Sequence, residues 1–561
     1  MQKNDIFEIE ITSMSSEGSG IGRVDEMVVF VPNTAIGDVV KIKIVKVLKS
    51  YAFGRLEEII KPSCDRIKND CPVFEKCGGC AYRHISYDSE LKLKSEQVFH
   101  NITAIGKTDY MKCEPLYDCK TERYRNKGQF PVGKNEKGEI VTGFYAPRSH
   151  RIIPISDCLL QPKIFSQIIS VCTDFFEKNN ISVYDETTKK GLIRHIYLRQ
   201  GEISREIMVC FVVNGKTFTD ANVLCERLSS EFPQIKSIIL NINRNDNNVI
   251  LGDKCITLWG SNTITDTMCG LNVSISPLSF YQVNHTMAQK VYELAGELAD
   301  FKGEETLLDL YCGAGLIGLS VAKKVKRVVG IEIINDAILN AKQNAKDNNI
   351  DNAEFYCGDA SFVAKLIDDG YKFDVAFVDP PRKGCSNDVI EALAISGAKK
   401  IVMISCNSAT LARDINFLKE KGYTVKDVVP ADLFPRTIHC ETVALLTLEN
   451  TVHNMKLFSA PFKMIKSGQK TIELRLFDKK RQKIKEGDKI IFTDTVSGEK
   501  LNRTVVKLHC FDSFEELYRS LPLLKCGYTI ENIDNAKPSD MEQYYSVEEQ
   551  NKYGVVGIEL S

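Results

Sequence analysis

The first sixty residues alternate apolar and polar positions in short runs, and glycines and prolines separate these runs. Phe7–Ile11 and Val39–Ile44 are two such runs, and Gly18, Gly20 and Pro32 lie between them. Alternation with a period of two predicts strands, and short strands divided by Gly and Pro are typical of a small barrel. We therefore expect an N-terminal β-barrel over residues 1–61.

The middle of the chain also has a strand pattern, from about Leu116 to Ser274. The apolar runs around Phe130, Ile193 and Ile238 predict strands, and a longer amphipathic stretch from about 162 to 179 predicts a helix between them. Together with the preceding segment, this pattern predicts a central α+β domain over residues 62–275.

Residues 276–450 have a different sequence pattern, in which continuous apolar runs alternate with stretches of helical periodicity. The runs Thr306–Leu310, Val328–Ile331, Phe373–Val378 and Ile401–Ile404 suit parallel strands that are covered on both faces. This pattern predicts an α/β Rossmann-like domain, in which ligands bind beyond the carboxyl ends of the strands. Polar Asn450–Asn454 then predicts a linker to a C-terminal domain over residues 453–561.

Composition excludes several classes of protein. The 561 residues suggest three to five domains, and a net charge of -1 means that any nucleic-acid surface is a local patch. The polar N-terminus and the lack of a long apolar run predict a cytoplasmic protein with no membrane partner. Nineteen cysteines without a secretion signal indicate thiols or a metal site rather than a disulfide framework. No obligate protein partner is inferred.

A glycine turn marks the cofactor region. Gly313, Gly315 and Gly318 follow the apolar strand that begins at Thr306, and Glu332 ends the next strand, where an acidic residue meets a ribose hydroxyl. The glycine pattern alone also fits a nicotinamide cofactor. Asp309 inside the first strand and the sequence Asp379-Pro-Pro-Arg382 after the fourth strand favour S-adenosylmethionine, because the rigid proline turn is typical of methyltransferases that act on bases.

Three cysteines within ten residues predict a metal centre. Cys71, Cys77 and Cys80 lie in a glycine-containing segment, and their spacing suits an iron-sulfur cluster with one remote ligand better than it suits zinc. Cys158 is the best remote candidate. The alternatives that spacing leaves open are Cys64, Cys113 and Cys119.

A thiol and a carboxylate are placed to act beside this methyl donor. Cys406 stands at the C-terminal end of the predicted strand over residues 401–407, and Glu441 lies in His-Cys-Glu further along. A thiolate that adds to carbon 6 of uracil makes carbon 5 nucleophilic, and a base must then remove the carbon-5 proton. We expect Cys406 to be the nucleophile and Glu441 the base. Cys312 and Cys440 are rival thiols.

At this point the chain resembles a known family. Residues 1 to about 450 are similar to the RNA uracil-5-methyltransferases, and specifically to their ribosomal RNA branch, which pairs a TRAM domain with a four-cysteine [4Fe-4S] cluster. The resemblance rests on Ser279–Asn284, Asp379–Gly384, Ser405–Asp414 and His439–Glu441. It implies the following roles: Gln282, Tyr311, Glu332 and Asp379 bind S-adenosylmethionine, Cys406 is the nucleophile, Glu441 is the base, and Cys71, Cys77, Cys80 and Cys158 are the cluster ligands.

The chain departs from the family pattern at two positions. Ser408 stands where many members have Pro, and Leu316 stands where some have a cofactor-contacting Asn. Because the transfer-RNA branch usually lacks both the TRAM barrel and the cluster, the resemblance favours 23S ribosomal RNA as the substrate, with the target uridine flipped into the site. A tRNA uracil-5-methyltransferase and a non-catalytic RNA-binding assembly factor remain the alternatives.

Both ends of the chain resemble RNA-associated modules. The N-terminal segment is similar to the TRAM domain, an OB-like barrel, at Gly18–Arg23, Val31-Pro32 and Gly37-Asp38. The C-terminal segment resembles the ASCH domain, a PUA-like β-barrel, at Gly468-x-Lys470-x-x-Glu473-x-Arg475 and Gly487-Asp488. We expect RNA to contact both modules. Some ASCH relatives are small hydrolases, so a catalytic C-terminal module with Lys470 and Glu473 as a polar pair in a cleft is the alternative. The N-terminal residues expected to face RNA are Lys41, Lys43, Lys46, Lys49, Tyr51, Phe53 and Arg55.

Overall fold

The computed structural model describes residues 1–109, 113–449 and 452–561. It divides into two compact units, Met1–Thr447 and Leu448–Ser561. In the described residues no helix is long and apolar enough to cross a membrane. All 19 cysteines are free thiols.

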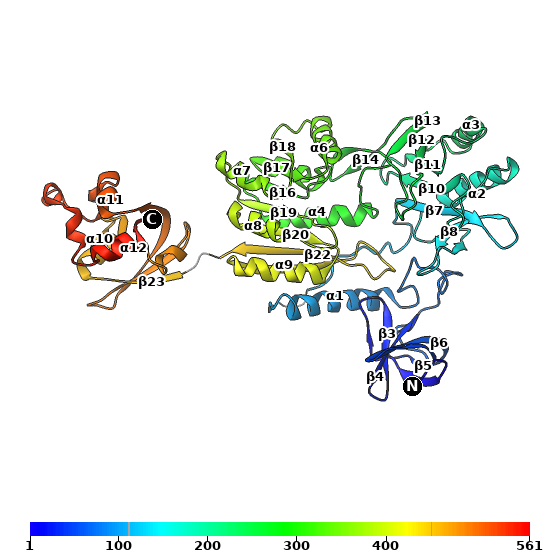
Figure 1. Ribbon diagram of the computed structural model, residues 1–561, viewed down its shortest axis with the longest axis horizontal. Helices are drawn as coiled ribbons and strands as arrows, with labels where there is room; N and C mark the ends of the chain where they lie inside the picture. Colours follow the sequence, from blue (N-terminus) through cyan, green and yellow to red (C-terminus); the bar gives the residue numbers. More distant parts are fainter. Residues whose placement is uncertain (110–112, 450–451) are drawn as a thin grey trace. The chain divides into compact units, whose positions relative to one another are not determined.

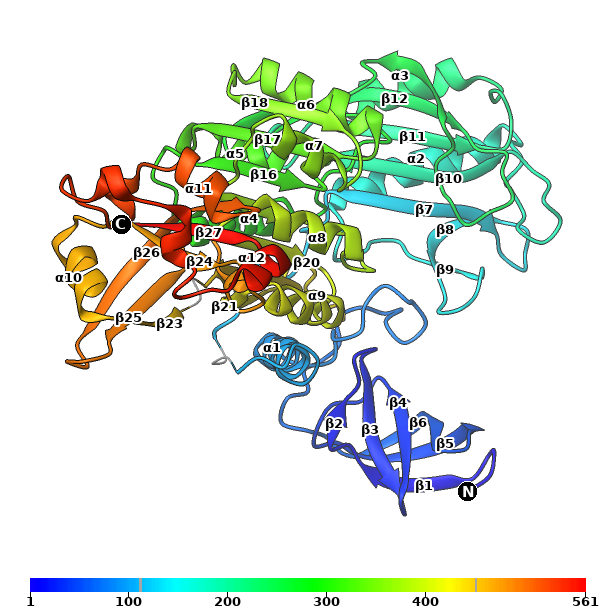
Figure 2. The ribbon, with the colours of Figure 1, turned by 60° about the vertical axis from the view of Figure 1, so that its left-hand side comes forward.

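The N-terminal segment folds as a six-stranded sheet in the order β1-β5-β6-β4-β3-β2. Alternate residues of its strands, such as Val40, Ile42 and Ile44, are fully buried in one apolar core, as the period-two pattern predicts. Figure 2 shows this sheet next to helix α1 (Tyr87–Ala104). The strands are β1 Ile6–Glu10, β2 Ser13–Met14, β3 Ser19–Val24, β4 Met27–Pro32, β5 Val39–Val47 and β6 Tyr51–Lys61.

The central segment forms a seven-stranded sheet in the order β13-β12-β11-β10-β7-β8-β9. Helices α2 and α3 pack on one face, where Phe165 and Leu224 join the core. The opposite face, with Tyr197 and Met208, joins the core of the following domain. The elements are β7 Lys127–Lys134, β8 Ile140–Tyr145, β9 Ile152–Pro154, α2 Lys163–Lys178, β10 Ile193–Gln200, β11 Ile207–Val213, α3 Ala221–Glu231, β12 Ile235–Ile242, β13 Lys254–Gly260, and the hairpin β14 Ile264–Met268 with β15 Leu271–Ile275.

A second seven-stranded sheet carries the expected cofactor and thiol motifs, in the order β18-β17-β16-β19-β20-β22-β21. Strands β16 to β20 are parallel, and β22 runs antiparallel to β20. Figure 1 shows helices on both sides of this sheet, with α1 beside α9. The elements are α4 His285–Ala299, β16 Thr306–Leu310, α5 Leu316–Ser320, a 3-10 turn Ala322–Lys324, β17 Arg327–Glu332, α6 Asn335–Asp347, β18 Ala353–Cys357, α7 Phe362–Asp368, β19 Val375–Val378, α8 Asn387–Ser396, β20 Lys400–Ser405, α9 Ser408–Glu420, β21 Tyr423–Ala431 and β22 Glu441–Leu448.

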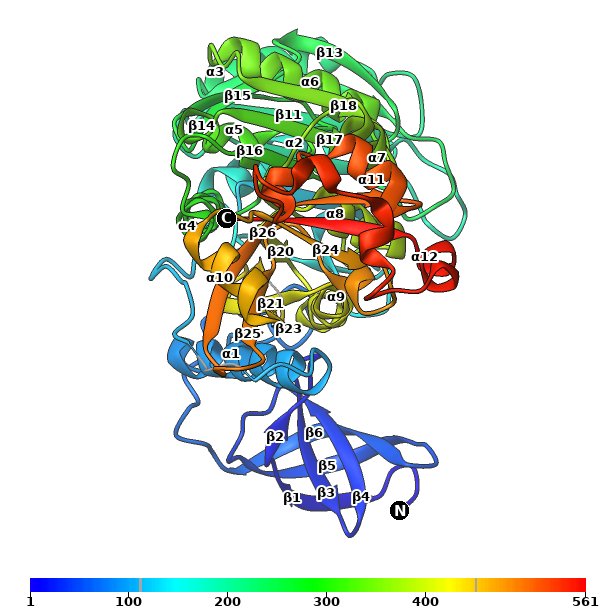
Figure 3. The ribbon, with the colours of Figure 1, turned by 90° about the vertical axis from the view of Figure 1, so that its left-hand side faces the viewer.

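The C-terminal unit is a half-barrel built on a five-stranded sheet in the order β23-β25-β26-β27-β24 (Figure 3). Strand β23 begins at Val452, within the segment predicted as a linker, and residues 450 and 451 lie outside the described part of the chain. The elements are β23 Val452–Leu457, α10 Ser459–Ser467, β24 Ile472–Leu476, β25 Lys489–Asp494, β26 Lys500–Phe511, α11 Phe514–Ser520, α12 Val547–Tyr553, β27 Val555–Leu560, and 3-10 turns Arg481–Lys483, Leu523–Cys526, Ile533–Asn535 and Pro538–Met541.

Candidate active site

Strands β20 and β22 bring Cys406 and Glu441 together. Their antiparallel register pairs Ser405 with Thr442, so the next residues, Cys406 and Glu441, face each other where β20 ends. Glu441 is the first residue of β22 and is buried, whereas Cys406 is half-buried. A thiol and a carboxyl group that are separated in sequence therefore lie side by side at the carboxyl end of the parallel strands.

The turn that carries Cys406 is organised by Asn407. The Asn407 Oδ1 accepts hydrogen bonds from the backbone N–H groups of Ala409 and Thr410, at 3.1 and 3.4 Å, and so caps α9. The Asn407 Nδ2 donates to the Arg382 carbonyl at 3.3 Å, which ties this turn to the Asp-Pro-Pro-Arg turn after β19. Ser408, one of the two departures from the family pattern, begins α9.

Charged side chains surround the Cys406 thiol. Burial raises the pKa of Cys406, and the Glu441 carboxyl adds to this rise, while the Arg382 guanidinium opposes it. Burial also raises the pKa of Glu441, with a further contribution from Asp379 and again with opposition from Arg382. Burial raises the pKa of Asp379 as well. A carboxyl group whose pKa is raised in this way exchanges a proton near neutral pH, and a general base in this position has to do so.

Three further residues at this edge were not assigned roles from the sequence. Arg382 Nη2 lies 3.3 Å from His439 Nε2. Burial, together with the charge of Arg382, lowers the pKa of His439 to about 4, so the imidazole is neutral and accepts this hydrogen bond. Tyr292 of α4 is buried next to Asp379, and a hydrogen bond from the Gln282 side chain lowers its pKa against the rise that burial causes. Tyr292 lies on an ordinary amphipathic helix, so no sequence pattern distinguishes it from a core residue.

The glycine turn between β16 and α5 has the backbone conformation that its sequence predicts. Tyr311, Gly313 and Gly315 have φ angles of 60, 53 and 78°, in the left-handed region. Asp309 Oδ2 accepts a hydrogen bond from the Gly318 N–H at 3.1 Å, and a Cβ on Gly318 would lie 2.7 Å from the same oxygen. The buried Asp309 carboxyl group therefore fixes the turn and requires glycine at position 318.

Glu332 lies over this turn at the end of β17. Its Oε2 accepts a hydrogen bond from the Gly313 N–H at 3.3 Å, and its Oε1 accepts one from the Ile334 N–H at 3.0 Å. Tyr311, Glu332 and Asp379 stand at the carboxyl ends of β16, β17 and β19, and Gln282, in the segment before α4, reaches the same edge through its hydrogen bond with Tyr292 beside Asp379. They lie where a doubly wound fold binds a nucleotide-like cofactor.

The two rival thiols are poorly placed for catalysis. Cys312 is buried within the cofactor turn, and burial raises its pKa. The Cys440 Sγ lies 3.3 Å from the Glu441 carbonyl, and burial raises the pKa of Cys440 to about 12. Cys406 is the thiol of the three that is both partly exposed and opposite Glu441.

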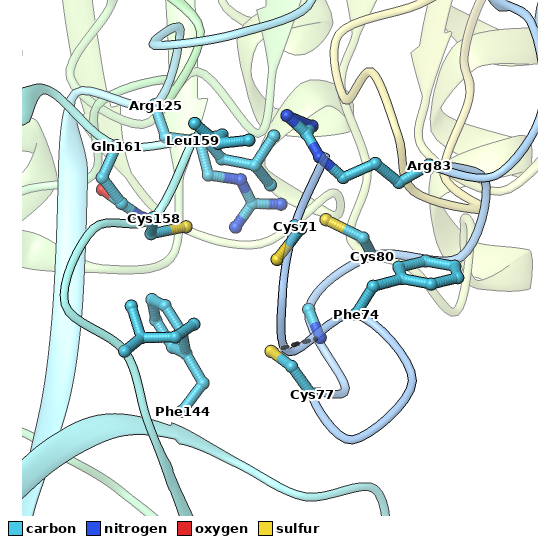
Figure 4. A pocket seen from close by; sticks show the side chains of 13 residues that line it. Cys71, Phe74, Cys77, Cys80, Arg83, Arg125, Phe144, Cys158, Leu159 and Gln161 are labelled. Carbon is cyan, nitrogen blue, oxygen red and sulfur yellow. Dashed lines mark hydrogen bonds between the residues drawn. The ribbon is translucent and has the colours of Figure 1, made fainter. Parts of the chain in front are cut away.

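The four predicted cluster cysteines line one cavity of about 90 Å³. Figure 4 shows Cys158 on one side of it and Cys71, Cys77 and Cys80 on the other, so Cys158 and the 71–80 segment lie at the same cavity. Of the competing thiols, Cys64 and Cys119 are exposed and Cys113 donates to the Val428 carbonyl at 2.8 Å, and these three do not line the cavity.

The chemistry of the cavity suits an anionic, sulfur-ligated group. Arg83 and Arg125 line it together with the cysteines, and Arg83 Nη1 is buried and has no hydrogen-bond partner among the described residues. Among the described residues, no group of three or more His, Cys, Asp or Glu side chains is arranged so that it could hold a metal ion. The donor set fits a cluster, although the sulfur atoms do not have ligating geometry here.

Comparison with known proteins identifies the chain. The profile of the tRNA (uracil-5-)-methyltransferase family matches residues 272–449, that of the TRAM domain residues 2–56, and that of the ASCH domain residues 455–561. A protein of Clostridium tetani named as an uncharacterized RNA methyltransferase is 42% identical over 448 residues, which are 80% of this chain and 97% of that protein. The chain belongs to this family of RNA methyltransferases. A second such relative, from Halalkalibacterium halodurans, is 41% identical over 452 residues, with coverage of 80% and 98%.

A solved structure supports the cofactor of this methyltransferase. The Pyrococcus abyssi tRNA (uracil-54, C5)-methyltransferase in complex with S-adenosyl-L-homocysteine has a TM-score of 0.65 and 27% sequence identity, and the alignment covers 78% of this chain and 99% of that chain. S-adenosyl-L-homocysteine is what remains of S-adenosylmethionine after methyl transfer. The enzyme is therefore an S-adenosylmethionine-dependent RNA methyltransferase.

The TRAM sheet of the methyltransferase carries an aromatic group next to basic residues. The rings of Phe30, Tyr51 and Phe53 lie with their centroids 5.5 to 5.8 Å apart. Strand pairing places Lys43 opposite Arg55 and Lys46 opposite Phe53. Aromatic rings beside cations are suited to stacking bases and contacting phosphates, in agreement with RNA binding by this domain.

The ASCH unit of the enzyme has a buried ionic group. Glu473 lies 3.0 Å from Lys470 Nζ and 3.0 Å from Arg475 Nη2, and its side chain is almost completely buried. Arg475 Nη1 also donates to the Tyr545 hydroxyl at 3.1 Å. The predicted Lys470-Glu473-Arg475 pattern is therefore one connected group of side chains.

Proposed function

We propose that this enzyme converts a uridine of 23S ribosomal RNA to 5-methyluridine through a covalent intermediate on Cys406. The observation that carries the proposal is the β20–β22 register, which places Cys406 opposite Glu441 beside the cofactor turn. A protein that only binds RNA has no physical need for a thiol beside a carboxyl group of raised pKa at this edge. The proposed cofactor-binding residues are Gln282, Tyr311, Glu332 and Asp379.

The reaction proceeds in three steps. The Cys406 thiolate adds to carbon 6 of the flipped uracil, which moves electron density to carbon 5. Carbon 5 then attacks the sulfonium methyl group, and S-adenosylhomocysteine leaves. Finally the Glu441 carboxylate removes the carbon-5 proton, the C5–H electrons form the carbon-5–carbon-6 double bond, and the carbon-sulfur bond breaks, which releases the Cys406 thiolate and 5-methyluridine.

Arg382 assists this sequence electrostatically. Its guanidinium holds down the pKa of both Cys406 and Glu441 against burial. It thus favours the thiolate that attacks and the carboxylate that later accepts the proton. Its hydrogen bond with the neutral His439 fixes the orientation of the guanidinium.

We further propose that Cys71, Cys77, Cys80 and Cys158 hold a [4Fe-4S] cluster. Their common cavity and the unpartnered Arg83 Nη1 support this assignment. When bound, the cluster supplies a covalent cross-link between Cys158 and the 71–80 segment. None of the steps above involves it.

Transfer RNA is the second candidate substrate. The TRAM module and the cysteine cavity favour ribosomal RNA through the family resemblance. The Pyrococcus abyssi tRNA enzyme, however, aligns with 78% of this chain, so the arrangement of modules does not separate the two RNAs.

The test uses anaerobically purified protein, S-adenosylmethionine and RNA that contains 5-fluorouridine. Fluorine cannot leave as a proton, so the methylated adduct remains bound to the enzyme. We expect wild-type protein, but not Cys406→Ala, to form a denaturation-resistant complex with 23S fragments, and mapping the complex locates the uridine. An adduct with tRNA alone would establish the second substrate, and no adduct with either RNA, while RNA still binds, would refute the covalent mechanism.

A further inference from the structure

The loop between β21 and β22, residues 432–440, leads directly into Glu441. Three segments from the N-terminal third of the chain contact it: the TRAM loop at Gly18, the segment after Cys80, and α1. A Cβ on Gly18 would lie 2.8 Å from Ile438 Cγ2, so glycine permits this close contact. Tyr124, which precedes the central sheet, also donates from its hydroxyl to the Pro435 carbonyl at 2.9 Å.

Arg436 is the point at which this loop is held most firmly. Its φ of 70° is in the left-handed region, which is unfavourable for a residue with a side chain. The Arg436 N–H donates to Glu90 Oε1 at 2.7 Å, and its carbonyl accepts from the N–H groups of Ala81 and Tyr82 at 2.8 and 3.1 Å. A strained conformation persists only where its surroundings impose it. Here the surroundings are α1 and the residues that follow Cys80.

Glu90 in turn belongs to a buried ionic group that spans α1 and the loop. Lys94 Nζ lies 2.7 Å from Glu90 Oε1 and 2.8 Å from Asp432 Oδ1, and it donates to the Phe434 carbonyl at 3.2 Å. Each of the three charged side chains is at most 3% exposed. Tyr87 donates its hydroxyl to Asp432 Oδ2 at 2.9 Å. Buried charges in this arrangement are geometrically demanding, because any shift of the loop leaves one of them unpaired.

We propose that Glu90 and Lys94 are positioning residues for Glu441, and that the cysteine-bearing segment shares this task through its hydrogen bonds to Arg436. The proposal rests on the proposed role of Glu441 as the base. It gives the segment beside the cluster ligands a function in the last step of the reaction. More than three hundred residues separate these parts in the sequence, and hydrogen bonds and ion pairs join them in the fold.

We expect displacement of Glu441 to slow one step of the reaction, the removal of the carbon-5 proton. If Glu441 is displaced while Cys406 and the cofactor turn are intact, the thiol still adds and the methyl group still transfers. The carbon-5 proton then leaves slowly, and a methylated covalent adduct accumulates on ordinary uridine. General destabilisation would instead lower adduct formation and cofactor binding together.

The main variant is Glu90→Gln/Lys94→Met, which removes one anion and one cation and so preserves the net charge of the buried group. The matched control is Arg227→Met/Glu231→Gln, which removes a partly exposed ion pair with the same i,i+4 spacing on α3. Tyr124→Phe is a milder second variant, because it deletes a single hydrogen bond to the loop. Glu441→Gln defines the signal for a missing base.

Each protein is mixed with S-adenosylmethionine and uridine-containing RNA, and adduct formation, release of methylated RNA and S-adenosylmethionine affinity are measured. We expect roughly 10- to 100-fold slower release and adduct accumulation for Glu90→Gln/Lys94→Met, since small misplacement of a reacting group has effects of this size. Tyr124→Phe should change release in the same direction by less. The control should behave as wild type, and S-adenosylmethionine affinity should be unchanged in all variants.

A second arm tests the cysteine segment. Iron chelation of wild-type protein should also cause adduct accumulation on uridine, with retained S-adenosylmethionine binding. Wild-type release rates in both Glu90→Gln/Lys94→Met and Tyr124→Phe, or loss of adduct formation in step with cofactor binding, would overturn the inference. If Glu441→Gln itself accumulates no adduct and wild type is not trapped by 5-fluorouridine, the proposed function fails instead.

Discussion

Gly315 of the cofactor turn combines a left-handed backbone with close neighbours, so an added methyl group should affect both stability and cofactor binding. It caps α5 with φ 78° and ψ 8°. A Cβ built on it would lie 2.9 Å from two ring atoms of Phe355 on β18 and 3.1 Å from the Cβ of Ala341 on α6. Gly315→Ala therefore adds a methyl group where the backbone disfavours a side chain and two neighbouring elements already fill the space.

The two penalties can be separated. The left-handed conformation costs about 1–2 kcal/mol for alanine, and overpacking of a filled site costs about 1–3 kcal/mol. The protein relieves the crowding by moving the turn away from Phe355, and this movement must be reversed when the cofactor binds. The overpacking part then appears in binding, where 1–3 kcal/mol corresponds to roughly 5- to 150-fold weaker affinity.

Gly397 provides the matched control. It ends α8 with φ 68° and ψ 13°, nearly the same conformation as Gly315, but a Cβ on it would meet no atom within 4 Å. Gly397→Ala should therefore show the backbone penalty alone. We expect a modest loss of thermal stability for Gly397→Ala, a larger loss for Gly315→Ala, and weaker S-adenosylmethionine binding for Gly315→Ala only.

The assay is calorimetric titration of each protein with S-adenosylmethionine, together with thermal unfolding without ligand. If Gly315→Ala binds the cofactor as tightly as wild type, the turn does not move or does not bind it. If both variants lose affinity equally, the effect is a general destabilisation. Either result would refute the packing argument.

Arg382→Gln should move the acid limb of the single-turnover pH–rate profile, at saturating RNA and cofactor, to higher pH by up to about one unit, because the lost cation no longer holds down the pKa of Glu441. If the acid limb of the profile does not move, a group other than Glu441 controls it. Cys158→Ser should lower the iron content of anaerobically purified protein, whereas Cys64→Ser, an exposed thiol outside the cavity, should not; equal iron loss in both would contradict the ligand set. A chain that ends at Glu449 should bind 23S fragments more weakly in filter-binding assays at several salt concentrations, because the C-terminal lysines and arginines would no longer contact phosphates. Equal affinity would exclude RNA binding by the C-terminal unit.

Much of the fold was predictable because local patterns decide strands and turns. The run 401–407 predicted β20, which the structure ends at Ser405, and the glycines from Gly313 on predicted the turn before α5. The predicted helix over about 162–179 corresponds to α2. The C-terminal sheet was predicted as a barrel, and the structure has a half-barrel, because closure depends on which strands meet at the edges and the alternation of residues does not report this.

The sequence by itself determined which chemical groups the protein carries and at which strand ends they stand. Cys406 follows an apolar strand and Asp379 precedes two prolines, so their places at the carboxyl edge of the sheet follow from local rules. Tertiary structure alone decided which of these groups meet. The β20–β22 register sets Glu441 against Cys406, the fold brings Cys158 to the 71–80 segment, and Glu90 reaches Arg436. These are contacts between distant parts of the chain, and their geometry depends on how whole elements pack.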